Sequence, residues 1–153
     1  MNQELHLYIQ FVVDNNRFAL SAKDVSGIVP LVSLHEVPKA PEYVAGILNY
    51  HGESVPVIDL TSLMTGDKTN QRLSTRIVLL KLTLAGGEQR SIGVMAEKVT
   101  EVTRINEAEF KKSGVKNTEA KYLGDVFTDS QGILQRLTVS ELLPKAAQQM
   151  LFE

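Results

Sequence analysis

The chain has 153 residues, 43% of them apolar, and a formal net charge of -2. This size suffices for one domain, or for two small subdomains that share a core. The absence of cysteine excludes disulfides and thiolate metal sites, and the mixed charges give no electrostatic reason to expect nucleic acid.

The first third of the sequence predicts a hairpin followed by a short helix or turn. Apolar residues alternate with mostly polar ones over 5–13 and again over 18–20, which is the period of a half-buried strand. Residues 14–16 between them are Asp-Asn-Asn, typical of a turn. Residues 21–24 match a capping box, and apolar residues follow at helical spacing over 25–29.

Residues 43–64 predict two apolar strands joined by a tight turn, then a one-turn helix. His51-Gly52 marks the turn, because glycine supplies the backbone freedom it needs. Asp59 stands at the N-cap position of the helix. Pro56 cannot donate a ladder hydrogen bond, so its strand is expected at a sheet edge or beside a bulge.

The rest of the chain predicts loops, further hairpins and a final helix. Residues 65–74 and 107–120 are polar loops, the second with helical turns. Turns at 85–88 and 129–132 join strands, and a capping box at 138–141 begins a helix that a following proline interrupts or restarts. Further strands are predicted over 34–37, 77–84, 92–94, 122–127 and 133–137.

The two halves of the sequence match each other at apolar positions. An offset of 74 residues gives four matches: Phe18 with Ile92, Leu20 with Val94, Val25 with Val99 and Ile28 with Val102. Further along the chain, an offset of 79 residues gives four more: Tyr43 with Tyr122, Leu60 with Val139, Leu63 with Leu142 and Met64 with Leu143. The change of offset falls in loops, where insertions are tolerated. One alternative is that any two β-rich stretches match in this way. The shared order of turn, hairpin and terminal helix favours a repeat of two small barrels.

A long segment carries a family pattern. Residues 43–60 read YVAGILNYHGESVPVIDL and follow Val37-Pro38. They resemble the CheW family, the coupling proteins of bacterial chemosensory arrays, whose pattern is Pro, an aromatic, Gly, Asn, an apolar residue, Arg-Gly, Val-Pro, two apolar positions and Asp-Leu. Weaker similarity lies at 25–28 and 122–124, so the resemblance covers nearly the whole chain.

The resemblance implies a mainly β fold: a single domain over 1–153, built of two SH3-like five-stranded β-barrel subdomains with short helices. We expect the first barrel at about 15–72 and the second at about 1–14 plus 73–153. It also implies a non-enzymatic adaptor, without metal or cofactor, that joins a chemoreceptor's cytoplasmic tip to the regulatory domain of a CheA-type histidine kinase. Such a protein would be cytoplasmic, at membrane-associated receptor arrays, without inserting into the membrane, and a monomer outside the array.

The resemblance also implies two sets of contact residues. A helical receptor tip needs a shallow apolar groove with a polar rim, and the matching positions are Val25, Ile28, Gly46, Asn49 and His51. Gly46 would allow close backbone approach, and Asn49 would hydrogen-bond the partner. The alternatives are core packing for Val25 and Ile28, turn geometry for Gly46, and an idle exposed position for His51.

Kinase contacts are expected at turns of both barrels, namely Gly86, Gly87, Asp129 and Gly132. The two halves and the kinase's own domain are alike, so alternating head-to-tail contacts are available.

Two positions depart from the family pattern. His51 replaces the usual arginine, a permanent cation with a planar fork of donors, by a smaller imidazole. This departure suggests a divergent array that controls pili or a second-messenger output. Ala96 stands where the family often has Asp, and no function is attached to it.

Other functional classes remain open. For an enzyme, His6, His35 and His51 lack metal-site spacing, and Asp59 is explained by capping. A nucleic-acid-binding barrel would need basic stripes and exposed aromatic residues. A CheW-like scaffold that binds receptors without coupling a kinase has the same sequence features.

Overall fold

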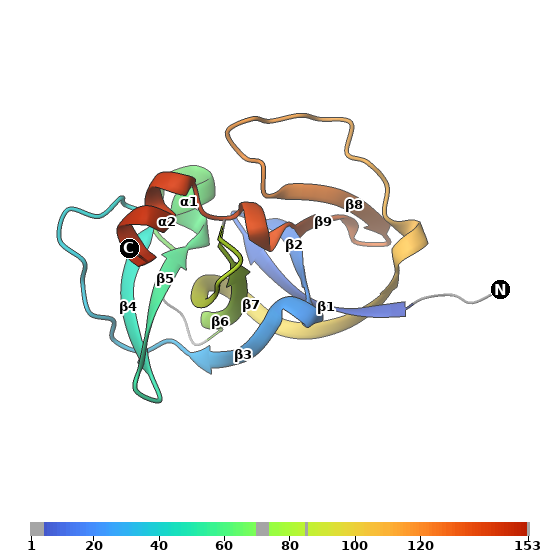
Figure 1. Cartoon of the computed structure of the whole chain (residues 1–153). Helices are drawn as coiled ribbons and strands as arrows, with labels where there is room; N and C mark the ends of the chain where they lie inside the picture. Colours follow the sequence, from blue (N-terminus) through green and yellow to red (C-terminus); the bar gives the residue numbers. More distant parts are fainter. Residues whose placement is uncertain (1–4, 70–73, 85, 153) are drawn as a thin grey trace.

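The computed structural model describes residues 5–69, 74–84 and 86–152 (Figure 1). The predicted loop over 65–74 and the turn at 85–88 therefore lie partly outside the described residues. The strands are β1 (Leu5–Val13), β2 (Asn16–Ser21), β3 (Val25–Pro30), β4 (Val44–Tyr50), β5 (Glu53–Asp59), β6 (Arg76–Thr83), β7 (Gln89–Asn106), β8 (Leu123–Asp129) and β9 (Gly132–Leu137). The helical segments are η1 (Ala22–Asp24), α1 (Leu60–Thr65), η2 (Glu107–Glu109), η3 (Val139–Glu141) and α2 (Lys145–Phe152).

The strands form two five-stranded units that share β7. In the first unit the order is β4-β5-β7-β6-β3, and in the second it is β7-β1-β2-β9-β8. The long β7 serves both, because residues 89–96 pair with β6 and residues 97–106 pair with β1. Among the described residues, neither ladder closes by continuous hydrogen bonding between its end strands. This mainly β architecture of two barrel-like units confirms the predicted fold class.

The internal repeat is confirmed by the strand registers. Val44 pairs with Ile58 in the first unit, and Leu123 pairs with Leu137 in the second, each at the predicted offset of 79. An isolated bridge joins His35 to Ile47, and an equivalent one joins Lys111 to Val126. At the offset of 74, β2 and β3 correspond to the two halves of β7. The matching apolar positions are therefore a structural repeat.

The two repeats exchange their hairpins. The β1–β2 hairpin of the first repeat pairs with β7 and β9, while β6 and the start of β7 pair with β3 and β5. This differs from the expected partition at residues 15 and 72, which placed β2 in the first barrel and β6 in the second. A hairpin buries the same alternate residues whether it pairs within its own repeat or with the other repeat. The hydrophobic pattern of the sequence therefore does not distinguish the two arrangements.

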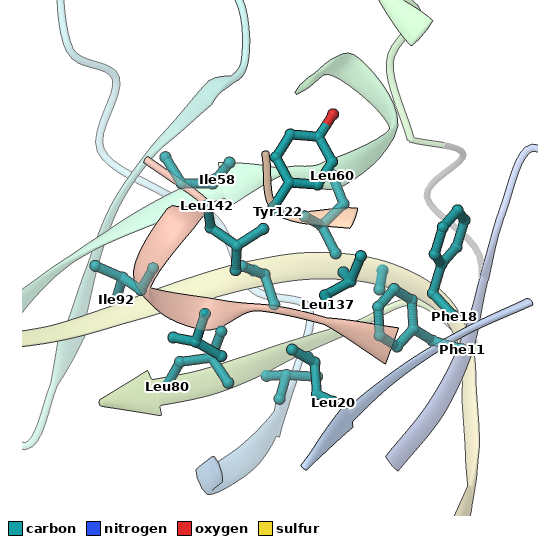
Figure 2. Close-up of a cluster of buried hydrophobic side chains, with 14 of the residues drawn as sticks. Phe11, Phe18, Leu20, Ile58, Leu60, Leu80, Ile92, Tyr122, Leu137 and Leu142 are labelled. Carbon is teal, nitrogen blue, oxygen red and sulfur yellow. The ribbon is translucent and has the colours of Figure 1, made fainter. Parts of the chain in front are cut away.

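One large core lies between the units (Figure 2). It combines Phe11, Phe18 and Leu20 from β1 and β2 with residues of both units, such as Leu80 on β6 and Leu137 on β9. Full burial of a leucine such as Leu20 stabilises the fold by roughly 1.5–3 kcal/mol. A smaller apolar cluster occupies the end of each unit. The shared core makes the two units one folding domain.

Two predicted elements near the N-terminus differ from the structure. The capping residue Ser21 does accept a hydrogen bond from the Lys23 backbone, but η1 ends at Asp24, and residues 25–30 form strand β3 rather than a helix. The burial of these residues alternates with period two. Pairing with β6 holds the backbone extended, which is the conformation that β-branched residues favour. The predicted strand over 34–37 is only the His35 bridge to Ile47.

Two proline positions also refine the predictions. The strand that contains Pro56 is not an edge strand, since β5 pairs with both β4 and β7, but the predicted bulge is present, because the β4–β5 register shifts between Val44 and Gly46, beside the Ile47–Pro56 pair. The parallel pairing with β7 begins only at Val57, so the missing proline donor interrupts no ladder on that side. Residues 139–141 form a single 3-10 turn, and the final helix α2 begins at Lys145, directly after Pro144. Proline therefore restarts the helix, as its fixed φ favours at a helix start.

Candidate functional site

The β4–β5 hairpin ends in a tight two-residue turn. Tyr50 pairs with Glu53, and His51 and Gly52 between them both have positive φ, 51° and 87°. Positive φ at both central residues is the type I′ geometry that matches the twist of a hairpin. The Asn49 side-chain oxygen accepts a hydrogen bond from the Gly52 backbone N–H at 3.0 Å. Asn49 thus fixes the turn that presents His51.

The exposed His51 ring lies beside Tyr50. The two ring centroids are 4.4 Å apart with an interplanar angle of 68°, an edge-on arrangement. This contact orients the imidazole, whose polar atoms remain available at the tip of the hairpin.

Strand β3 passes close to this hairpin. A Cβ built on Gly27 would lie 3.8 Å from the Tyr50 hydroxyl, which places the inward face of β3 beside the end of β4. Val25 is half-buried and packs against the large core, so the core-packing interpretation holds for it. Ile28, on the outward face, is 42% exposed and is not a core residue. The structure thus brings the inward face of β3 close to the Tyr50 side chain at the end of β4.

The backbone of Gly46 lies close to another segment of the same chain, at Leu34 and His35. It is buried with φ of 150°, and an added Cβ would lie 2.7 Å from the His35 carbonyl oxygen and 2.8 Å from the Leu34 Cβ. The expectation that Gly46 admits a partner's backbone therefore needs correction. Its role in this structure is to let the segment that contains His35 bridge to β4.

The predicted kinase-contact turns belong to different units. Gly86 and Gly87 lie in the exposed turn between β6 and β7, which pair in the first unit. Asp129 and Gly132 form the β8–β9 hairpin of the second unit. The Asp129 carboxylate binds both terminal nitrogens of Arg17, at 2.8 and 2.9 Å. Asp129 is therefore a structural anchor between β8 and β2.

One exposed apolar residue was missed by the sequence analysis. Val102, on β7, is 62% exposed although Ile9 directly opposite is buried. Val102 is the repeat equivalent of Ile28, so each unit exposes a β-branched residue at the same position. The offset of 74 residues contained this signal.

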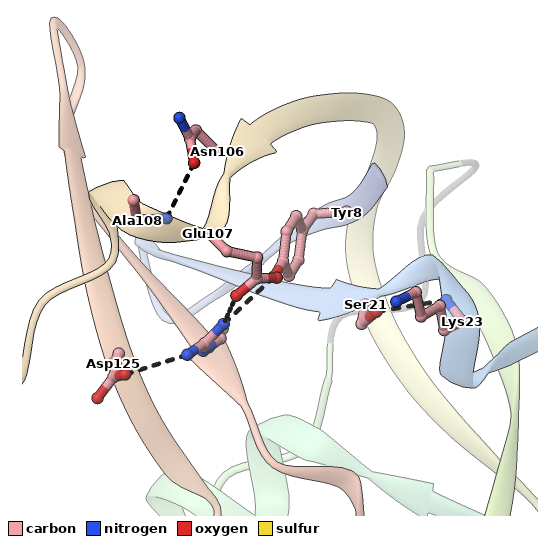
Figure 3. A network of polar contacts seen from close by, with 8 residues as sticks. Tyr8, Ser21, Lys23, Asn106, Glu107, Ala108 and Asp125 are labelled. Atoms are coloured by element: carbon pink, nitrogen blue, oxygen red, sulfur yellow. Dashed lines mark hydrogen bonds and ion pairs between the residues drawn. The ribbon is translucent and has the colours of Figure 1, made fainter. Parts of the chain in front are cut away.

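A polar cluster closes the end of the second unit (Figure 3). The Arg136 guanidinium donates to Glu107 at 2.6 Å and to Asp125 at 3.0 Å, and the Tyr8 hydroxyl donates to Glu107. Arg136 also lies 4.3 Å above the ring of Phe110, a cation–π contact. These contacts anchor η2 and the start of the following loop to the sheet.

The cluster shifts the pKa values of its members. Burial alone would raise the pKa of Glu107, but the hydrogen bonds from Tyr8 and Arg136 and the charge of Arg136 together lower it. The pKa of Tyr8 is raised, first by burial and then by its hydrogen bond to Glu107. Glu107 is thus held as a carboxylate and Tyr8 as a phenol, which is the protonation pattern that the contacts require.

Asp59 is committed to local structure. Its carboxylate is buried and accepts hydrogen bonds from the backbone of Ser62 at 3.2 Å and of Thr69 at 3.0 Å, and from the Thr69 hydroxyl. The predicted N-cap is confirmed. Within 5–69, 74–84 and 86–152, His, Cys, Asp and Glu side chains form no group of three suited to a metal ion. In the same ranges, none of the helices has both the length and the apolar character needed to cross a bilayer.

The fold and the exposed strands define a repeat-built β module with apolar residues on its surface. A family model, the CheW-like domain, matches residues 7–147, and the chain belongs to this family.

Individual relatives support the assignment. The chain is 23% identical over 144 residues to the chemotaxis protein CheW of Thermotoga maritima, covering 87% of this chain and 90% of that protein. It is 22% identical over 143 residues to the CheW of Bacillus subtilis, covering 92% and 88%. Among solved structures, the scaffolding protein TtCheW of Thermoanaerobacter tengcongensis superposes with a TM-score of 0.81 at 22% identity, over 95% of this chain and 92% of that chain.

Proposed function

We propose that this protein is a non-enzymatic adaptor that couples the cytoplasmic tips of chemoreceptors to a CheA-type histidine kinase. Family membership supports the adaptor class, since the similar proteins are named as chemotaxis and scaffolding proteins. The observation that carries the receptor contact is that Ile28 on β3 and Asn49 and His51 at the end of the β4–β5 hairpin are all exposed. The protein would act in the cytoplasm, at membrane-associated receptor arrays.

The receptor surface combines an apolar strand with a polar tip. Ile28 offers apolar area that is already exposed, and Val102 adds the equivalent residue of the second unit. Asn49 and His51 offer polar groups on a turn whose backbone is fixed. A helical receptor tip matches this combination, since helices dock their apolar face into shallow grooves with a polar rim. Val25 holds β3 in place by packing against the large core, and Gly46 lets the segment that contains His35 bridge to β4.

The kinase contact is proposed at the turns that contain Gly86 and Gly87 in the first unit and Asp129 and Gly132 in the second. Both units share one architecture, so a kinase domain of the same architecture can contact one unit on each side of the adaptor. Such head-to-tail contacts generate rings when the rotation between neighbours closes.

His51 supports the proposal of a divergent array that acts on pili or a second messenger. The imidazole lies at the tip of the proposed receptor surface, where the family usually presents a guanidinium. A change from a five-donor fork to a small imidazole ring alters which receptor groups can pair there.

A second candidate function is a scaffold that binds receptors and no kinase. Exposed apolar residues occur on β3 and β7, whereas Asp129, in a proposed kinase turn, is already paired with Arg17. Binding of the kinase domain separates the two functions.

The test is a calorimetric titration with a receptor-tip fragment and, separately, with the kinase regulatory domain. The adaptor function predicts binding to both, and Ile28→Asp and His51→Ala should each weaken only the receptor complex. Ile133→Asp is the matched control for the receptor arm, because Ile133 is a similarly exposed isoleucine on the second unit. Binding to the receptor alone would favour the second candidate, and binding to neither would remove both.

A further inference from the structure

An open groove runs beneath the long loop that precedes β8. One part has a volume of about 390 Å³ and reaches the β1–β2 turn and Met64, and the other has about 600 Å³ and lies under residues 113–121. The two parts share Asn117, Ala120, Leu123, Ile133 and Gln135, so they form one continuous groove, here called the β8–β9 groove. In Figure 1 the loop arches over β8.

The floor of the groove is apolar and uncovered. Ile133 on β9 is 61% exposed, Val115 in the loop is 77% exposed, and Leu123 lies between the two parts. Large exposed apolar side chains gathered along a groove mark a surface that a partner covers.

The rim of the groove is cationic although the protein is acidic overall. Residues 110–121 contain four lysines and one glutamate, in a chain whose net charge is -2. Lys116 and Lys121 line the groove itself. At the other end Arg17 is neutralised by Asp129 and Asp14 adds a carboxylate, so the positive charge is confined to the end beneath the loop. The loop therefore brings local positive charge to an apolar floor, which complements a ligand with an apolar face and acidic flanks.

We propose that the β8–β9 groove binds an acidic amphipathic helix of a partner protein. The helix would place its apolar side chains on Leu123 and Ile133 and its carboxylates beside Lys116 and Lys121, the helix-in-groove mode of recognition. Addition of a partner strand to β8 is disfavoured, because the backbone N–H and carbonyl of Val126 are already hydrogen-bonded to the backbone of Lys111, at 2.8 and 2.9 Å. A phosphate backbone would pair with the lysines but leave the apolar floor exposed. The site requires neither receptor nor kinase and goes beyond the coupling function.

The test uses the full chain with isoleucine δ1-methyl labels and a designed amphipathic peptide of about 18 residues, long enough to form a helix on binding. Its apolar face is leucine, and its polar face is glutamate in one version and lysine in the other. The glutamate peptide should shift the Ile133 methyl resonance and leave that of exposed Ile28 unchanged. Its affinity should fall as salt rises, and the lysine version should bind at least about tenfold more weakly.

Two variants sharpen the result. The double variant Lys116→Glu, Lys121→Glu should reverse the preference between the two peptides, and Ile133→Asp should abolish binding of the glutamate peptide. Ile28→Asp is the matched control and should bind it as the wild type does. All sites are on the surface, and the buried isoleucine methyl resonances report whether each variant stays folded. Equal affinity for both peptides, no binding, shifts at Ile28 in place of Ile133, or preference for a single-stranded oligonucleotide would each overturn the proposal.

Discussion

The two units have the same backbone but close their outer ends with different chemistry. In the second unit Arg136 binds Glu107 and Asp125 and lies against Phe110. At the offsets of the repeat, Arg136 corresponds to Val57 and Asp125 to Gly46, and the first unit is closed by an apolar cluster.

The difference shows that the shared fold determines which positions of the two repeats lie close together. The residue types at those positions determine whether the contact is an ion pair or apolar packing. The end of each unit holds an apolar cluster, and in the second unit an ion network lies beside that cluster. The second unit thereby gains a sensitivity to pH and salt at its end.

The largest expected effect comes from exchanging the two central residues. Val57→Arg should destabilise the protein by on the order of 4 kcal/mol, because it buries a charge among aliphatic side chains with no acidic partner. Arg136→Val should cost only about 1–2 kcal/mol, since Glu107 and Asp125 are partly exposed and can be hydrated. Urea unfolding measures both, and equal losses would contradict the comparison.

Gly46→Ala should be the next largest effect, at about 3 kcal/mol. The positive φ disfavours an L side chain, and the added Cβ would lie 2.7 Å from the His35 carbonyl oxygen. Gly86→Ala is the control: nothing lies within 4 Å of its added Cβ, so thermal unfolding should change little. Similar shifts in both variants would argue against the close approach.

Acidification should lower the stability of the protein through Glu107, which lies at the end of the second unit. Its folded pKa is lowered from 4.5, so its contribution to stability is present above pH 4.5 and is lost as the pH falls through the folded pKa. Glu107→Gln should therefore lose less stability than the wild type between neutral pH and that window. Parallel urea titrations at each pH give the difference, and identical pH dependence would show that Glu107 does not carry this linkage.

The smallest expected effect lies at the β4–β5 turn. Asn49→Ala should cost about 0.5–1 kcal/mol, since it removes the acceptor for the Gly52 N–H at an exposed site. Thr128 holds the equivalent position of the second unit, and Thr128→Ala should change the unfolding midpoint less. A larger loss from Thr128→Ala would contradict the capping role of Asn49.

Local features of this fold could be predicted from sequence, because their partners are near in the chain. The turn at His51-Gly52 and the cap at Asp59 each involve residues within a few positions. The Arg136 cluster could not be predicted, because Arg136 meets Tyr8 across 128 positions of sequence. The receptor site stays a prediction: Ile28 and His51 are exposed, as that site requires, the exposed Val102 was not among the predicted residues, and Gly46 makes its close approach to its own chain.

The most direct test of the coupling function measures kinase control. Receptor-tip fragments on a lipid template would be combined with the CheA-type kinase, with and without this protein, and kinase autophosphorylation would be followed. The proposed function predicts that receptors change kinase activity only when the protein is present, and that Ile28→Asp abolishes this control while kinase-domain binding persists. Control of the kinase without the protein, or no control with it, would contradict the account.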